Sequence, residues 1–165
     1  MKIENKKLLY TKMDCNLNIC HEIKTKIHTN TIQHYTVIFL SGNIKKISLK
    51  DKLSLGVNSD RSFHNMPSSH SEVMALNAIK HYKNLPRKLD ILVIRFNKYG
   101  EIRQSRPCLH CLKYMNHYCQ KYKFNINNVY YSTSQDSIIK EKFNDLLKSK
   151  HQHICFGMRK KLGLI

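Results

Sequence analysis

Two short motifs contain the residues best suited to chemistry: H-x-E, which begins at His70, and P-C-x-x-C, which begins at Pro107. A zinc ion accepts imidazole nitrogen and thiolate sulfur, and catalytic zinc sites use three protein ligands and leave a fourth position for water. His70, Cys108 and Cys111 supply that number of ligands. Glu72 lies two residues beyond the histidine and is placed to accept a proton from a water that the metal acidifies. The spacing therefore predicts a catalytic zinc site.

Each motif alone also has a structural interpretation. Ser69 and Glu72 match an S-x-x-E capping box, in which the glutamate only satisfies a backbone N–H group. Cys108 and Cys111 fit buried small apolar residues, or a structural zinc site with other ligands. The candidates for those other ligands are Cys15, Cys20, His117 and Cys119. The two motifs together, each opening a predicted helix and separated by a predicted strand, favour the catalytic interpretation.

The combined pattern resembles the cytidine deaminase-like superfamily, broadly the CMP/dCMP-type zinc deaminase domain, over residues 33–132. The resemblance implies that His70, Cys108 and Cys111 hold Zn²⁺ and that Glu72 shuttles protons. It also implies hydrolytic deamination, in which water attacks a base and ammonia leaves. Zn²⁺ is accordingly the expected cofactor.

The resemblance extends to a G-x-N motif at residues 56–58, which implies that Asn58 contacts the substrate. Ser71 stands where the family most often has alanine, and a small side chain should fit there. The stretch H-S-E-V-M-A-L at residues 70–76 is similar to tRNA adenosine deaminases, but no glutamate precedes Pro107 as it does in them. APOBEC-type enzymes carry a tryptophan before the P-C motif, and this sequence has none.

The charge balance suggests a polyanionic partner, because 29 Lys and Arg face 11 Asp and Glu and give a formal charge of +18. An AT-rich coding sequence would account for part of this basicity. The run from Lys148 to Lys161 contains no acid, and is either a phosphate-tracking arm or a solvated basic end.

The expected substrate is a cytosine-containing nucleoside, nucleotide or nucleic acid. The alternatives are an adenosine deaminase of the tRNA type and a non-catalytic, zinc-stabilised nucleic-acid-binding module.

Composition and patterning predict how the chain is organised. With 165 residues, 41% of them hydrophobic, we expect one domain over 1–165 with a basic C-terminal end at 148–165. No signal peptide or membrane span is evident, so we expect a soluble intracellular protein. By analogy with the family, it is expected to form homo-oligomers.

The predicted helices are 6–29, 72–82, 108–123 and 143–150, and the predicted strands are 34–40 and 44–49 (a hairpin), 89–96, 129–131 and 137–142. Residues 60–69 are predicted to form a loop. This order predicts a three-layer α/β/α sandwich around a mixed sheet of about five strands.

Overall fold

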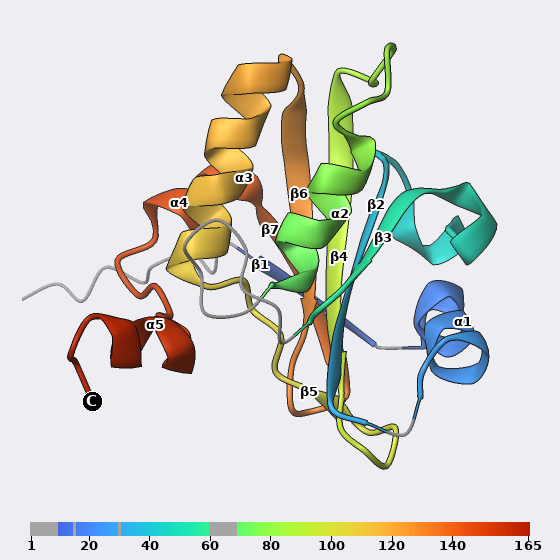
Figure 1. Ribbon diagram of the computed structural model, residues 1–165. Helices are drawn as coiled ribbons and strands as arrows, with labels where there is room; N and C mark the ends of the chain where they lie inside the picture. The colour runs from blue at the N-terminus through green and yellow to red at the C-terminus, as the bar shows by residue number, and fades with distance from the viewer. Residues whose placement is uncertain (1–9, 15, 30, 60–68) are drawn as a thin grey trace, which may run out of the picture.

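The computed structural model describes residues 10–14, 16–29, 31–59 and 69–165. Within these ranges the chain is a mixed α/β protein with a seven-stranded sheet and five α-helices (Figure 1). In chain order the elements are β1 (Tyr10–Asp14), α1 (Asn18–Lys26), β2 (Gln33–Leu40), β3 (Lys52–Val57), α2 (Ser71–Ile79), β4 (Lys88–Phe96), β5 (Ile102–Arg103), α3 (Leu109–Tyr122), β6 (Asn125–Ser132), β7 (Ser137–Lys142), α4 (Phe143–Lys148) and α5 (Phe156–Lys161). Two short 3₁₀ helices, η1 (Ile44–Lys46) and η2 (Leu49–Asp51), lie between β2 and β3.

The sheet is mixed and has the strand order β1-β7-β6-β4-β2-β3, with β5 paired to β4. Only β4 and β6 run parallel, and every other pair is antiparallel. The nearly continuous apolar run of β4 predicts a central strand, and this is confirmed: Leu92 pairs with Val37 of β2 on one side and with Tyr130 of β6 on the other.

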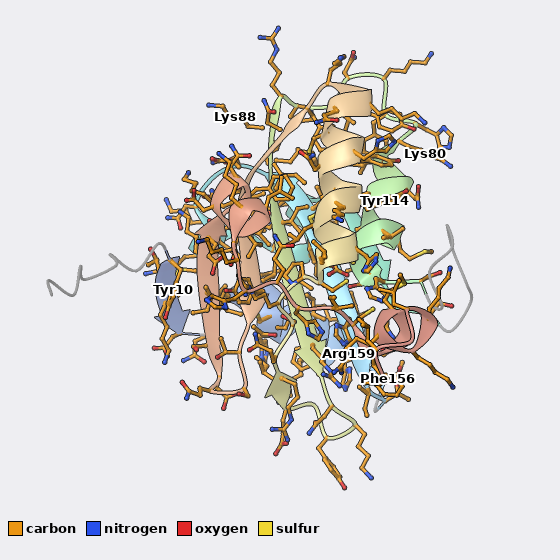
Figure 2. The ribbon with its side chains drawn as sticks, turned by 90° about the vertical axis from the view of Figure 1, so that its left-hand side faces the viewer. Tyr10, Lys80, Lys88, Tyr114, Phe156 and Arg159 are labelled. Carbon is orange, nitrogen blue, oxygen red and sulfur yellow. The ribbon has the colours of Figure 1, made fainter. Side chains whose placement is uncertain are left out.

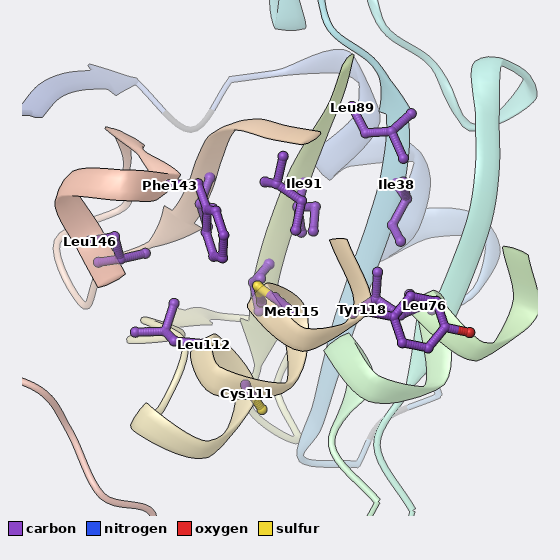
Figure 3. Close-up of a cluster of buried hydrophobic side chains, with 14 of the residues drawn as sticks. Ile38, Leu76, Leu89, Ile91, Cys111, Leu112, Met115, Tyr118, Phe143 and Leu146 are labelled. Atoms are coloured by element: carbon purple, nitrogen blue, oxygen red, sulfur yellow. The ribbon is translucent and has the colours of Figure 1, made fainter. Parts of the chain in front are cut away.

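Alternate residues of β4 enter two separate hydrophobic clusters, as the two-residue period of a strand requires. Ile91 and Val93 belong to the cluster formed with α2, α3 and α4, part of which Figure 3 shows. Leu92 and Ile94 belong to the other cluster, formed with α1 and η1. Helices thus cover both faces of the sheet, and α2 and α3 lie side by side on one of them (Figure 1).

Helix α2 packs on β3 at a position that only glycine allows. A Cβ atom on Gly56 would lie 2.1 Å from the carbonyl oxygen of Ser71 and 2.5 Å from the backbone nitrogen of Ala75. These are backbone atoms in the first two turns of α2, so the helix would have to move as a whole. Gly56 of the G-x-N motif therefore sets where α2 begins relative to the sheet.

The predicted hairpin of 34–40 and 44–49 is wrong in its second strand. Residues 44–49 contain η1 and the start of η2, and the antiparallel partner of β2 is β3, with Tyr35 opposite Val57. Local polar contacts favour the 3₁₀ turns: the Asn43 side chain accepts a hydrogen bond from the Lys45 backbone, and Ser48 forms a capping box with Asp51.

The predicted helix over 6–29 is also too long. Helix α1 covers only Asn18–Lys26, and residues 10–14 form β1, which pairs with β7; residues 6–9 lie outside the described chain. Together with β3 and the two-residue β5, this edge strand brings the sheet to seven strands rather than about five. Of the predicted loop over 60–69, residues 60–68 likewise lie outside the described ranges.

Candidate metal centre

The H-x-E and P-C-x-x-C motifs both lie at helix starts, as predicted. His70 is the N-cap residue of α2 and Cys108 is the N-cap residue of α3. Both starts lie at the same end of the sheet (Figure 1), so the motifs face each other although they are far apart in the sequence. The capping-box alternative is wrong, because it requires Ser69 rather than His70 at the N-cap position.

Buried serine hydroxyls hold the segment before α3 against the sheet. The Ser105 hydroxyl donates to the Val93 carbonyl at 2.7 Å and accepts from the Ser132 backbone N–H at 2.8 Å. The Ser132 hydroxyl in turn donates to the Arg103 carbonyl at 2.6 Å. Ser105 precedes Cys108 by only three residues, so these contacts fix the approach of the chain to the P-C-x-x-C motif.

The His70 ring lies close to both predicted cysteine ligands. Each potential metal-binding group found in the described residues contains two of the three predicted ligands: His70 and Cys108 with Cys155, and His70 and Cys111 with Glu72. His70 Nδ1 lies 3.1 Å from Cys111 Sγ and 3.6 Å from Cys108 Sγ. A tetrahedral zinc ion with ordinary bond lengths separates nitrogen and sulfur ligands by about 3.5 Å. The donor set and these distances fit Zn²⁺.

The two cysteines have opposite acidities. A hydrogen bond from Cys111 is the main cause that lowers the pKa of the Cys108 thiol to about 3, and a hydrogen bond from His70 adds to it. The same contact with Cys108, followed by burial, raises the pKa of Cys111 well above its usual value. The contact between the two thiols and the hydrogen bond from His70 thus favour a thiolate in this pair, and the thiolate is the form that binds a metal.

Glu72 is a buried carboxylate beside these ligands, with 5% of its surface exposed. Burial is the main cause that raises its pKa, and the negative charge of Cys108 adds to it. The ligand atoms of Glu72, His70 and Cys111 all lie within 4.8 Å of one another. Ser71 hydrogen-bonds both Glu72, at 3.3 Å, and Thr36, at 2.8 Å, so it links the carboxyl group to β2. Glu72 is thus held in place beside the candidate ligands.

Cys155 is a further candidate ligand that the sequence reasoning missed. Its sulfur, the sulfur of Cys108 and one ring nitrogen of His70 all lie within 4.8 Å of one another. Of the predicted alternatives, Cys15 lies outside the described residues. Cys20, His117 and Cys119 take part in neither potential metal-binding group found in the described chain. Sequence spacing carries no signal for Cys155, because its approach depends on how the C-terminal segment folds back.

A pocket of about 400 Å³ opens beside the ligand cluster, within the size range of small-molecule sites. Glu72 and Asn58 both line it, so the predicted substrate-binding residue and the predicted catalytic residue share one pocket. The Asn58 side-chain oxygen accepts a hydrogen bond from the backbone N–H of His34 at 2.7 Å, which fixes its orientation. Asn58 is thus a preorganised polar group in the pocket wall.

The pocket wall also contains His34 and Arg95 from the sheet. Burial is the main cause that lowers the pKa of His34 to about 4, and the Arg95 charge adds to it, so this imidazole is neutral at pH 7. The Nε atom of Arg95 is buried and has no hydrogen-bond partner in the part of the chain that the structure describes. Arg95 therefore offers a donor to a ligand that carries an oxygen acceptor.

Comparisons of this chain with protein-family models, with curated proteins and with solved structures found no match. The chemistry of the site must therefore be inferred from its own residues. Among the residues that the structure describes, none of the helices is long and apolar enough to cross a membrane.

Proposed function

We propose that this chain is a zinc-dependent hydrolytic deaminase that acts on the cytosine of a nucleoside, nucleotide or nucleic acid. The observation that carries the proposal is that one ring nitrogen of His70 lies 3.1 Å from Cys111 Sγ and 3.6 Å from Cys108 Sγ, while the buried carboxyl group of Glu72 is grouped with His70 and Cys111. The proposal includes the three-layer α/β/α arrangement of the cytidine deaminase-like superfamily. The helices on both faces of the mixed sheet support that arrangement.

The proposed chemistry divides between the metal and the protein. When bound, Zn²⁺ supplies Lewis acidity that makes water a nucleophile at neutral pH. His70, Cys108 and Cys111 would hold the ion. Glu72 accepts one proton of the attacking water and delivers it to the ring nitrogen of the base. It then carries the second proton of that water from the new hydroxyl group to the amino group, which leaves as ammonia as the carbonyl forms. Its burial and the contact with Ser71 hold the carboxyl group for these transfers.

The pocket supports a base attached to a sugar or a phosphate. Asn58 supplies an amide group next to Glu72, and Arg95 supplies the buried Nε donor for a carbonyl or phosphate oxygen. The formal charge of +18 favours a phosphorylated or polymeric substrate. The preference for cytosine over adenine rests on the sequence resemblance, since the residues before Cys108 depart from the tRNA adenosine deaminase pattern.

A second candidate function is a zinc-stabilised module that binds nucleic acid without catalysis. The observation in its favour is Cys155, because a fourth protein ligand is typical of structural zinc sites. In such a module Glu72 has no proton to transfer. Substitution of Glu72 would then leave both the metal content and the nucleic-acid affinity unchanged.

We further propose that the protein works inside the cell. Cys108, Cys111, Cys119 and Cys155 are free thiols. Free thiols persist in reducing compartments, where clustered cysteines serve metal binding and catalysis more often than cross-linking. Pairing of subunits is proposed by analogy with the family alone, and light scattering would measure it.

The experiment that tests the catalytic proposal combines elemental analysis with ammonia release. The substrates are cytidine, deoxycytidine, their monophosphates, single-stranded DNA and tRNA, together with the adenine counterparts. We expect about one zinc per chain, ammonia from a cytosine substrate, and loss of at least 10²-fold in turnover for Glu72→Gln with zinc retained. The matched control is Glu101→Gln, which changes an exposed carboxylate outside the pocket and should keep full turnover. Turnover that is equal in Glu72→Gln and wild type would refute the proposed mechanism.

A further inference from the structure

The C-terminal arm, defined here as residues 149–161, forms one wall of the pocket. His153, Cys155, Phe156 and Arg159 line the same cavity as the ligand cluster and Glu72. Figure 1 shows α5 beside the start of α3, and Figure 2 shows Phe156 and Arg159 on this short helix. Whatever enters the pocket must therefore meet residues of the arm.

Three hydrogen bonds attach the arm to the P-C-x-x-C segment. The backbone N–H of Leu109 donates to the His153 carbonyl at 2.7 Å. The Arg106 guanidinium donates to the His151 carbonyl at 2.7 Å and to the Ser149 hydroxyl at 3.4 Å. Because these donors flank Cys108 on both sides, they bring Cys155 next to it.

The position of Cys155 fits a metal ligand. Its sulfur lies within 4.8 Å of both Cys108 Sγ and a nitrogen of His70. In a tetrahedral zinc site these separations are about 3.8 Å and 3.5 Å, so a shift of roughly an ångström would bring the thiol into the coordination shell. Cys111 Sγ lies 3.1 Å from the same histidine ring. A site that used all four side chains would have one histidine and three cysteines, a common zinc-binding combination.

We propose that Cys155 is a fourth, displaceable ligand of the metal, through which the C-terminal arm holds the site in a closed state. Its thiol releases a proton to solvent when it binds the ion, and takes one up when it leaves. Four protein ligands leave no position for water, so turnover requires the arm to withdraw its sulfur. The ligand assignment stands on the cluster alone, whereas the closed state rests on the proposed deaminase function.

Helix α5 of the arm buries little side-chain surface, which suits a ligand that binds the metal reversibly. Met158 is the one side chain of α5 that is buried, with 7% of its surface exposed, while Phe156 is 67% exposed. In contrast, Cys111 lies in the first turn of α3 and is fully buried. Local opening of the arm would therefore expose no major part of the core.

Cobalt substitution tests the assignment by a spectroscopic readout that does not depend on activity. Each thiolate on Co²⁺ adds to the charge-transfer absorption in the near ultraviolet. We expect Cys155→Ser to lose about a third of this absorption, since three thiolates become two. The matched control is Cys119→Ser, which changes another partly buried cysteine that lies outside the cluster and should leave the spectrum unchanged. Equal spectra for Cys155→Ser and wild type would overturn the proposal.

X-ray absorption at the zinc edge of the wild-type protein needs no variant and serves if Cys155→Ser does not fold. We expect three sulfur and one nitrogen neighbours, and two sulfur neighbours would overturn the assignment.

Measurements of turnover distinguish the failure of the ligand assignment from the failure of the deaminase proposal. Three sulfur ligands with no ammonia release from wild type or Cys155→Ser would refute the deaminase and with it the closed state, leaving Cys155 as a structural ligand. Turnover in Cys155→Ser at least as high as in wild type supports the closed state, and a loss of turnover in this variant contradicts it.

Discussion

The helix starts and the C-terminal arm supply the two sides of one pocket, but the fold holds them in different ways. The starts of α2 and α3 are fixed by backbone packing at Gly56 and by buried hydrogen bonds around Ser105. The arm is attached to the start of α3 by three hydrogen bonds from Arg106 and Leu109, and Gln152 donates to the Leu146 and Leu147 carbonyls of α4. The residues proposed to perform chemistry thus lie on rigid elements, and the residues proposed to control access lie on the part that opens most easily.

This contrast follows from what each function requires. Proton transfer and metal binding need side chains held in one geometry, and buried hydrogen bonds provide it at the cost of mobility. Access to a closed pocket needs a segment whose opening free energy is well below that of global unfolding. The predictions below change one region at a time and measure whether the other responds.

The largest effect is expected for Gly56→Ala. The new Cβ would lie 2.1 Å from the carbonyl oxygen of Ser71, so α2 must move away from β3 and carry His70 and Glu72 with it. We expect a loss of about 3 kcal/mol in the free energy of unfolding and weaker metal binding, measured by urea denaturation and metal titration. The control Gly42→Ala, whose Cβ would lie 3.8 Å from its nearest neighbour, should change stability by less than about 1 kcal/mol. Equal effects of the two substitutions would show that the close contact at Gly56 does not matter.

A smaller effect on the same region is expected for Ser105→Ala. The substitution leaves the buried Ser132 N–H without its short contact to Ser105 and removes the donor to the Val93 carbonyl. We expect a loss of about 2 kcal/mol in the free energy of unfolding, measured by thermal or urea denaturation. Ser134→Ala, at an exposed serine, serves as the control and should be neutral. If Ser105→Ala is as stable as the control, these hydrogen bonds do not fix the start of α3.

Arg106→Ala should affect the arm more than the helix starts. It removes two of the three hydrogen bonds that join residues 149–153 to residues 106–109, and also the ion pair with Glu141 at 3.8 Å. We expect the alkylation rate of Cys155, followed by mass spectrometry in the metal-free protein, to rise about tenfold or more. Arg103→Ala, which removes an exposed arginine side chain, is the control. An unchanged rate for Cys155 in Arg106→Ala would mean that other contacts hold the arm.

The smallest effect is expected in a comparison of backbone hydrogen-exchange rates within the wild-type protein. The backbone N–H groups of Arg159 and Leu162 are hydrogen-bonded within α5, and that of Leu112 is hydrogen-bonded in the first turn of α3. We expect exchange at Arg159 and Leu162 to be at least about tenfold faster than at Leu112, because local opening frees the arm first. Similar protection of the two regions would contradict the difference in rigidity.

The helix starts could be predicted from the sequence because their signals are local. The H-x-E and P-C-x-x-C motifs coincide with the N-caps of α2 and α3, and the apolar run of β4 identifies a strand covered on both faces. The position of each ligand relative to its own helix follows from a few neighbouring residues. The meeting of the two motifs was predicted from the ligand set that zinc requires and from the family resemblance, and not from any local pattern.

The remaining features depend on contacts between distant segments, which local patterns do not encode. Residues 10–14 form β1 only because the edge of β7 is available for pairing. Residues 44–49 have the apolar pattern of a strand, but local polar contacts at Asn43 and Ser48 favour 3₁₀ turns instead. Cys155 reaches the cluster because hydrogen bonds to the arm fold it back over the start of α3, and no spacing rule predicts that contact.

The most direct test is ammonia release from cytosine substrates by zinc-loaded wild type and Glu72→Gln, with the zinc content measured in the same samples. Glu72 is buried beside the predicted ligands, so its substitution separates proton transfer from metal binding. We predict about one zinc per chain in both proteins and ammonia from the wild type alone. Zinc in both proteins without ammonia from either would contradict the deaminase proposal.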